Sequence, residues 1–495
     1  MNASNILAAV DLGATSGRVL TGQLDDGVLR LAQAHRFANR IVSLPIHRKP
    51  VPYWDLLALW QNVLNGLTKL SGQPVASIGV DGWGVDYGYL CDDGSLLGSA
   101  RSYRYAGLAD GVDAISAIKS AEEIYRLNGL QFQRFNTIYQ LAHDCLAEAG
   151  IDRLASCRNW LLIPDLLNFW LTGNAATELT NASTTGLIDP ETRTWSKQLF
   201  SALGEVAVTD VSSKTAELVT AGDVVGELNP SIMNLQDAAG NLSEVISVAS
   251  HDTASAVAAT PLTSRNSAYI SCGTWSLVGV ELKRPVVTEA ARAANFTNEL
   301  GVDGTVRFLK NVSGMWIVNE CIRNWRASGT SIDAETLCAK AKATNGFETV
   351  LDVNSPDLFL TGKMPEKIAN LAKKTGQAVP QTLGEFGYCI INSLALAHAK
   401  ALNEIMQVTD RQIDVVHIVG GGCQNDLLCQ LTADASGLPV VAGPIEASAT
   451  GNLLVQARAL RLIGQGLADM RRVVADSFEL KTYKPKTAVN HKIKS

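Results

Sequence analysis

One local pattern, a strand followed by a turn of small residues and a second strand, occurs twice in this chain and restricts its fold most strongly. The apolar run Ile6–Val10 ends at the turn 11–17 (DLGATSG), and Arg18–Leu24 resumes an extended pattern. About half a chain later, Ala268–Leu282 repeats the arrangement around a Cys-Gly-Thr turn. Two hairpins of this kind indicate two duplicated α/β lobes rather than one long sheet.

A turn-rich segment between the two hairpins marks the expected domain boundary. Asp237–Ser243 contains Gly240 and Asn241 and directly precedes a strand pattern. We therefore predict an N-terminal lobe, residues 1–243, and a C-terminal lobe, residues 244–495. A length of 495 residues agrees with this division, because one hydrophobic core rarely supports so long a chain.

Composition and charge exclude several classes of protein. Hydrophobic residues make up 46% of the chain and charged residues 18%, so burial can offset chain entropy and the chain should fold. A net charge of −6 argues against a nucleic-acid partner, since such binding relies on Lys and Arg at phosphates. Asp11 interrupts the first apolar run too early for a signal peptide, and no window is apolar enough to span a membrane. Nine cysteines without CxxC pairs predict reduced thiols, so we expect a cytoplasmic protein without a membrane partner.

The first hairpin turn has the chemistry of a phosphate-binding loop. Its glycines permit close backbone approach, and the small residues between them offer amides and hydroxyls to an anion. Asp11 is a candidate to hold Mg²⁺ through water. The predicted phosphate contacts are Ala14, Thr15, Ser16, Gly17 and Arg18. An ordinary turn built from turn-forming residues is the alternative.

Two motifs in the second half suit the rest of a nucleotide. Thr274, at the tip of the second hairpin, can face the terminal phosphates. Strand Val415–Val419 leads into Gly420-Gly-Gly422 and a helical pattern over Asn425–Ala435. Three consecutive glycines are best explained where a ring or ribose lies against the main chain. Neither a P-loop nor a dinucleotide fingerprint competes with this interpretation.

The motif Ser250-His-Asp-Thr253 follows a strand and supplies a carboxylate. Asp252 could accept the proton of an attacking hydroxyl during phosphoryl transfer. Its alternative role is the N-cap of a helix beginning at Thr253, where it would satisfy free backbone amides. His251 is either a substrate contact or a buried polar group.

Seven motifs, taken in chain order, resemble the FGGY family of carbohydrate kinases. They are VDLGATSGR (10–18), VDGWGVD (80–86), TNASTTGLID (180–189), ASHDTASAV (249–257), SCGTWSL (271–277), LKN (309–311) and HIVGGGCQN (417–425). The resemblance extends from Val10 to about Gly451. It implies an α/β, two-lobed actin/hexokinase-like fold of ribonuclease-H-like lobes, with ATP and a sugar in a central cleft.

The resemblance also implies roles for single residues. The ATP site would comprise Ala14, Thr15, Ser16, Gly17, Arg18, Thr274 and Gly421, and the ketose site Gly84, His251, Asp252, Thr253 and Asn311. Asp252 would be the general base. This chain departs from the family pattern at Tyr105, where many members keep a carboxylate, and at Asn319, where a longer amide is expected. Thr432 and Ser436 replace cysteines that pair in some relatives.

Within the family, the motifs are most similar to those of kinases that phosphorylate L-rhamnulose at its 1-hydroxyl, with ATP and Mg²⁺ as cofactors. Another ketose, such as L-fuculose or a pentulose, is the nearest alternative. An actin-like ATPase without kinase activity is a second alternative, because the fold alone does not separate the two classes. The Ser250-His-Asp-Thr253 carboxylate and the tryptophans beside the polar motifs favour the kinase.

Overall fold

The computed structural model describes residues 5–46, 48–146, 153–207, 210–344, 346–359 and 361–486, in two compact units. Unit 1 comprises Met1–Ala259, Leu282–Phe308 and Ala447–Ser477, and unit 2 comprises Thr260–Glu281, Leu309–Glu446 and Phe478–Ser495. These bounds differ from a single cut after Ser243. Residues beyond that point return to unit 1 because their strand pairs with its sheet and a late helix packs on it.

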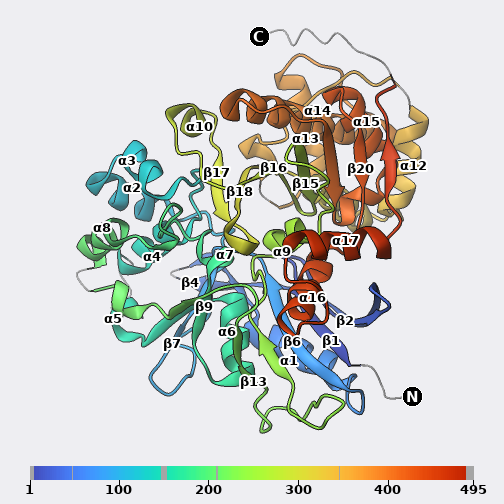
Figure 1. The fold of residues 1–495 in the computed structure, drawn as a ribbon. Helices are drawn as coiled ribbons and strands as arrows, with labels where there is room; N and C mark the ends of the chain where they lie inside the picture. Colours follow the sequence, from blue (N-terminus) through green and yellow to red (C-terminus); the bar gives the residue numbers. More distant parts are fainter. Residues whose placement is uncertain are drawn as a thin grey trace. The chain divides into compact units, whose positions relative to one another are not determined.

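The sheet of unit 1 is built around the first hairpin (Figure 1). Its strand order is β13-β14-β6-β1-β2-β3. Strand β1 pairs antiparallel with β2, with Asp11 opposite Arg18, and parallel with β6, with Asp11 opposite Asp81. The strands are β1 (Ile6–Leu12), β2 (Ser16–Asp25), β3 (Val28–Ala38), β6 (Val75–Gly82), β13 (Val224–Glu227) and β14 (Glu244–Ile246).

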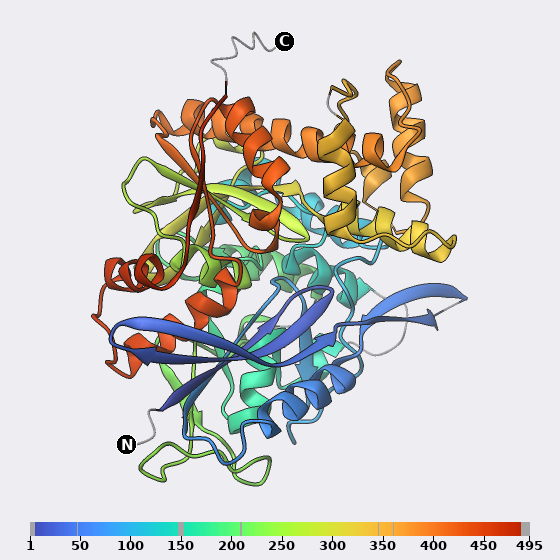
Figure 2. The same cartoon turned by 90° about the vertical axis from the view of Figure 1, so that its right-hand side faces the viewer.

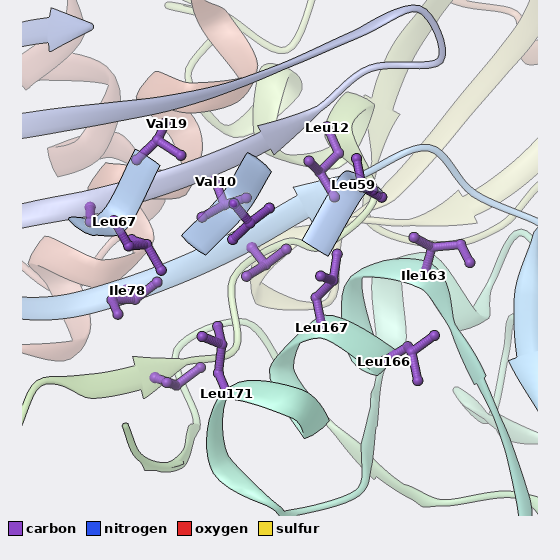
Figure 3. Close-up of a cluster of buried hydrophobic side chains, with 14 of the residues drawn as sticks. Val10, Leu12, Val19, Leu59, Leu67, Ile78, Ile163, Leu166, Leu167 and Leu171 are labelled. Atoms are coloured by element: carbon purple, nitrogen blue, oxygen red, sulfur yellow. The ribbon is translucent and has the colours of Figure 1, made fainter. Parts of the chain in front are cut away.

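Alternation along β1 divides its side chains between two helical layers. Ala8, Val10 and Leu12 join the hydrophobic core formed with α1 (Leu56–Thr68) and α6 (Ile163–Thr172), as Figure 3 shows. Helix α16 (Ala447–Ala459) covers the opposite face of the sheet (Figure 2). Close approach there requires Gly79, since a Cβ at this position would lie 2.5 Å from Asn452 Oδ1.

Unit 1 contains further strands and helices outside this sheet. They are the strands β4 (Ile41–Ile46), β5 (Lys49–Trp54), β7 (Tyr87–Leu90), β8 (Asn159–Leu162), β9 (Ala176–Glu178), β10 (Ile188–Asp189), β11 (Thr194–Trp195), β12 (Glu217–Val219) and β17 (Thr297–Leu300), and the helices α2 (Ala109–Ile118), α3 (Ala121–Asn128), α4 (Thr137–Leu146), α5 (Arg153–Ser156), α7 (Leu179–Ala182), α8 (Lys197–Ala207), α9 (Asp252–Ala258), α10 (Glu289–Ala293) and α17 (Leu467–Ser477).

Unit 2 repeats the arrangement around the second hairpin. Strand β15 (Ser267–Cys272) pairs antiparallel with β16 (Trp275–Leu282) and parallel with β19 (Val415–Val419). Beyond β19, the next strands of this sheet are β20 (Val440–Ala442) and β21 (Lys481–Tyr483). Both hairpins predicted from the sequence are therefore confirmed, and each has a parallel strand beside its first strand.

Helices make up most of the rest of unit 2. They are α11 (Trp316–Ala327), α12 (Ala334–Thr344), α13 (Met364–Lys374), α14 (Leu383–Thr409) and α15 (Asp426–Ser436), and strand β18 (Val306–Ser313) runs from unit 1 into unit 2. Helix α14 begins at a capping box in which Thr382 and Glu385 satisfy each other's backbone amides. Among the described residues, no helix is both long and apolar enough to cross a membrane.

Candidate active site

Three carboxylates meet at one edge of the unit 1 sheet. Asp11 and Asp81 face each other at the carboxyl ends of β1 and β6, and a bridge from Gly82 to His251 brings Asp252 beside them. Burial raises the pKa of Asp81 well above its usual range, and the charges of Asp11 and Asp252 raise it further against a hydrogen bond from Asn452. Asp81 and Asp252 thus titrate under the influence of neighbouring carboxylates at this edge.

Hydrogen bonds from Asn39 hold the first hairpin turn, and Thr15 in that turn is exposed to solvent. Asn39 donates from its backbone to the Thr15 carbonyl (3.1 Å) and from its side chain to the Gly13 carbonyl (3.0 Å). Thr15 is exposed, with partly buried Ala14 and Ser16 on either side of it. Arg18 Nη2 lies 2.6 Å from Asp11 Oδ2, so the one basic residue of this motif is held at the root of the turn.

Asp252 is the first residue of α9 and does not occupy the N-cap position. The alternative that Asp252 is the N-cap of a helix beginning at Thr253 is therefore wrong. The cap is His251, whose side chain makes no capping bond with the described residues. The Asp252 side chain is 29% exposed, and its Oδ1 accepts a hydrogen bond from Thr253 Oγ1 at 3.2 Å. Burial raises the pKa of Asp252, His251 opposes that shift, and Asp11 adds to it, leaving a net rise. This carboxylate is available for a task other than capping.

The Gly84 loop is strained and tightly held. Val85 has φ +67°, a left-handed conformation that is rare for a β-branched residue and common at functional sites. Its amide donates to Thr184 Oγ1 (3.1 Å), and its carbonyl accepts from Thr137 Oγ1 (2.7 Å). A Cβ at Gly84 would lie 2.7 Å from the same Thr184 Oγ1, so the loop requires glycine there.

One segment, residues 178–184, braces both this loop and the Asp252 loop. Glu178 is fully buried and accepts hydrogen bonds from the Ser250 amide and hydroxyl, each at 3.0 Å. Thr184, at the other end of the segment, holds Val85. The motif at 180–189 contributed to the family resemblance but had no predicted role. The dense run of Thr, Asn and Ser in TNASTTG was the signal that could have identified it.

In unit 2, the second hairpin and the glycine turn pack together through Cys272. A Cβ at Gly422 would lie 2.2 Å from Cys272 Sγ, and one at Gly420, which has φ +81°, would lie 3.1 Å from the Cys272 carbonyl. Gly421 differs, since a Cβ there would have no neighbour within 4 Å in the described part of the chain. The turn is a short 3-10 helix, Gly421–Gln424, and Asn425 caps the following α15.

The start of α11 holds the tip of the second hairpin. The Met315 amide donates to the Gly273 carbonyl (2.9 Å), and the Trp316 amide donates to the Thr274 carbonyl (3.2 Å). Asn311 is partly buried on β18, the strand next to β16 in the sheet. Unit 2 thus contains both the hairpin tip with Thr274 and the glycine turn with Gly421, and that turn packs against Cys272 of the hairpin.

Two ranges that together cover most of the chain match one family. Residues 6–259 match the N-terminal domain of the FGGY family of carbohydrate kinases, and residues 268–460 match its C-terminal domain. The chain belongs to the FGGY family of carbohydrate kinases. Membership makes it a carbohydrate kinase and excludes the alternative of an actin-like ATPase without kinase activity.

This FGGY kinase is similar to known proteins in sequence and, separately, in fold. It is 38% identical to a rhamnulokinase of Bacteroides thetaiotaomicron over 96% of this chain and 95% of that protein. It is 39% identical to a rhamnulokinase of Bacillus subtilis over 97% and 96% of the two chains. Two solved structures share its fold at low identity, and they confirm the two-lobed α/β fold expected from the sequence. They are a ligand-bound xylulose kinase from Lactobacillus acidophilus (TM-score 0.76, 16% identity, 97% and 94% covered) and a glycerol kinase from Plasmodium falciparum with ADP (TM-score 0.75, 14% identity, 98% and 94% covered).

The predicted site residues of this FGGY kinase divide between its units. Unit 1 contains Asp11, Ala14, Thr15, Ser16, Gly17, Arg18, Gly84, His251, Asp252 and Thr253, and unit 2 contains Thr274, Asn311 and Gly421. Within unit 1 the phosphate hairpin and Asp252 converge on one sheet edge. The ligand contacts of these residues stay predictions.

Asp86, the last residue of the motif VDGWGVD, supports the neighbouring aromatic residues. It is fully buried, and its Oδ2 accepts from Trp54 Nε1 (2.6 Å) and Trp83 Nε1 (3.1 Å). The Tyr103 amide donates to the same oxygen, and Gln140 Nε2 donates to Oδ1. The two indole rings lie 4.3 Å apart. The carboxylate thus sets the position of the tryptophan pair.

Replacing this carboxylate should change how stability depends on pH. Burial raises the pKa of Asp86 to about 6, although bonds from Trp54, Tyr103, Gln140 and Trp83 oppose the shift. As pH rises from 4 to 6, the unfolded chain ionises before the folded protein does, so Asp86 lowers stability across that window by about 3 kcal/mol. Asp86→Asn removes this slope. Thermal unfolding of both proteins from pH 4 to 7 should show a difference in unfolding free energy that changes up to pH 6 and then levels. A difference that is constant with pH would contradict the assignment.

Proposed function

We propose that this FGGY kinase transfers the γ-phosphoryl group of ATP to the 1-hydroxyl of L-rhamnulose, giving L-rhamnulose 1-phosphate and ADP, as a step in L-rhamnose catabolism. The similarity to rhamnulokinases over nearly the whole chain supports this substrate. The observation that supports the chemistry is the Asp252 carboxylate. It lies near the Asp11 and Asp81 carboxylates of unit 1, at the first residue of α9 and not at its N-cap.

The proposed reaction assigns a role to each predicted site residue. Asp252 takes the proton from the primary hydroxyl, the hydroxyl oxygen bonds to the γ-phosphorus, and the bond from that phosphorus to the bridging oxygen breaks to release ADP. Ala14, Thr15, Ser16, Gly17 and Arg18 bind the phosphates of ATP, and so does Thr274. Gly421 lies beside the adenosine, because its open main chain can approach a ring or ribose. Gly84, His251, Thr253 and Asn311 contact the ketose.

The oxygen chemistry of the unit 1 edge suits Mg²⁺, which such transfer uses to neutralise developing charge. Asp81 Oδ1 is buried without a hydrogen-bond partner among the described residues, at an edge shared with two further carboxylates. Asp11 would hold the ion through water. In the described part of the chain, no group of three His, Cys, Asp or Glu side chains forms a direct metal site.

Nine free thiols suit a reducing compartment, which supports a cytoplasmic enzyme. Its partners are the ketose and ATP alone. Neither a nucleic acid nor a membrane is required for the proposed reaction.

A coupled ADP-release assay across ketoses tests the substrate. L-rhamnulose, L-fuculose, several pentuloses and a blank without sugar are compared at equal concentration. We expect the highest kcat/KM for L-rhamnulose and little ADP from the blank. A higher value for L-fuculose or a pentulose would transfer the assignment to that sugar.

Arg18→Ala tests the phosphate hairpin. Removing the cation beside Asp11 should raise the KM for ATP or lower kcat by about 10-fold, equivalent to about 1.4 kcal/mol of lost interaction. Ketose binding, measured by calorimetry without nucleotide, should stay near the wild-type value. Arg18→Lys, which keeps the charge, is the matched control. Loss of sugar affinity with normal ATP kinetics would show that the hairpin has another role.

A further inference from the structure

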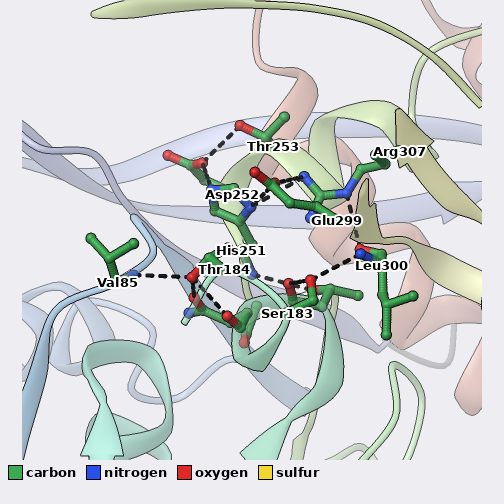
Figure 4. A network of polar contacts seen from close by, with 12 residues as sticks. Val85, Ser183, Thr184, His251, Asp252, Thr253, Glu299, Leu300 and Arg307 are labelled. Atoms are coloured by element: carbon green, nitrogen blue, oxygen red, sulfur yellow. Dashed lines mark hydrogen bonds and ion pairs between the residues drawn. The ribbon is translucent and has the colours of Figure 1, made fainter. Parts of the chain in front are cut away.

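A buried ion pair lies directly behind His251 (Figure 4). Arg307 has no exposed surface, and Glu299 is 6% exposed. Arg307 Nη1 lies 3.1 Å from Glu299 Oε2 and 3.1 Å from His251 Nδ1. On the other side of the imidazole, Nε2 lies 3.6 Å from Asp252 Oδ1. A continuous chain of charged and polar groups therefore leads from Arg307 to Asp252, within unit 1.

The pair is rigidly placed and stays charged. Arg307 Nε donates to the Leu300 carbonyl at 3.0 Å, and the Leu300 amide donates to Ser183 Oγ at 2.9 Å. Burial alone would raise the pKa of Glu299, but the net shift is downward, with the charge of Arg307 as the largest opposing influence. Glu299 is thus a carboxylate, and the guanidinium is always a cation. Because the two opposite charges lie 3.1 Å apart, their electrostatic effects on His251 largely cancel.

This geometry selects one protonation state of His251. A guanidinium only donates hydrogen bonds, so the ring nitrogen that bonds to Arg307 must accept. Glu299 Oε2 lies farther from Nδ1, at 3.3 Å. With Nδ1 accepting, the proton of the neutral ring belongs on Nε2, which faces Asp252.

We propose that Arg307 and Glu299 are positioning residues that hold His251 neutral with its proton on Nε2, so that this N–H points at Asp252 and stabilises its carboxylate form. The inference rests on the proposed function, since it concerns Asp252 as the base. The carboxylate form of Asp252 needs such support because its surroundings disfavour ionisation. Burial and the charge of Asp11, on β1, raise the pKa of Asp252, and His251 and Thr253 are the neighbours that favour its ionisation.

The test is ¹⁵N NMR of the full-length enzyme labelled at histidine, with His251→Asn used to assign the signal. At pH 7 the wild type should show the shifts of a neutral ring protonated at Nε2. Arg307→Met should move His251 to the Nδ1-protonated form, which donates to Glu299, or to the imidazolium. It should lower kcat by about 10²-fold with little change in the KM for ATP. Arg307→Lys keeps a cation and should restore part of the rate.

Arg307→Met leaves a buried carboxylate unpaired and could fail to fold. The double variant Arg307→Met with Glu299→Leu removes both charges, and such apolar replacements usually preserve stability. It should show mixed His251 tautomers and a reduced kcat. A wild-type ring protonated at Nδ1, or a double variant with wild-type tautomer and kcat, would overturn the proposal. The NMR result needs no turnover, so failure to phosphorylate any ketose would count against the proposed function alone.

Discussion

An Asp252→Asn enzyme is expected to lose about 10²–10⁴-fold in kcat while keeping its fold and much of its ketose binding. The amide has nearly the shape of the carboxylate but no basic oxygen for the proton of the sugar hydroxyl. Because His251, and not Asp252, caps α9, the substitution removes no helix cap. The measurements are kcat, ketose affinity by calorimetry and thermal unfolding.

Asp55→Asn is the matched control in the same unit. Asp55 Oδ1 accepts a bond from the Ala58 amide at the start of α1, and asparagine caps a helix about as well as aspartate. Both rate and stability should stay close to the wild type. Near-native turnover in a folded Asp252→Asn protein would remove Asp252 from the mechanism.

Gly314→Ala is expected to lower kcat/KM for ATP by about 10²-fold, because it displaces the tip of the second hairpin. A Cβ at Gly314 would lie 2.5 Å from the Trp275 carbonyl carbon and 2.8 Å from the Thr274 carbonyl oxygen. These are backbone atoms, which cannot move aside as a flexible side chain can. The strain should also cost about 1–3 kcal/mol of stability. Steady-state kinetics at varied ATP and chemical unfolding measure the two effects.

Gly421→Ala is the companion variant, since a Cβ there meets nothing within 4 Å in the described structure. Its stability should match the wild type. If the adenosine lies against this main chain, the KM for ATP should rise several-fold, by about 1 kcal/mol.

Unchanged ATP kinetics in Gly314→Ala would show that the Thr274 tip does not contact the nucleotide.

Local chemistry made the strands and turns predictable. Hydrophobic runs that end at small polar residues marked β1, β15 and β16, and the glycine run after β19 marked the turn before α15. These signals depend on neighbours in the chain, so they can be read from one sequence. The order of the motifs then identified the family.

Pairing between distant segments could not be read in this way. Nothing in the residues around Glu178 shows that its carboxylate will hold Ser250, which lies 72 positions later. The hydrogen bonds to Asp86 likewise come from Trp54 and Gln140, so segments far away in the chain hold this carboxylate. The grouping of residues 447–477 with the first sheet has the same origin, since it depends on how α16 packs there.

Short segments and their order were enough to identify the family, the two hairpins and the types of residue available for phosphate, sugar and proton transfer. Which carboxylate serves which purpose became clear from the folded chain alone. It gave the cap of α9 to His251, buried Asp86 under two tryptophans and placed Arg307 and Glu299 behind His251. The physical reason is that burial and hydrogen-bond partners set the task of a charged group, and both are properties of packing between segments far apart in the chain.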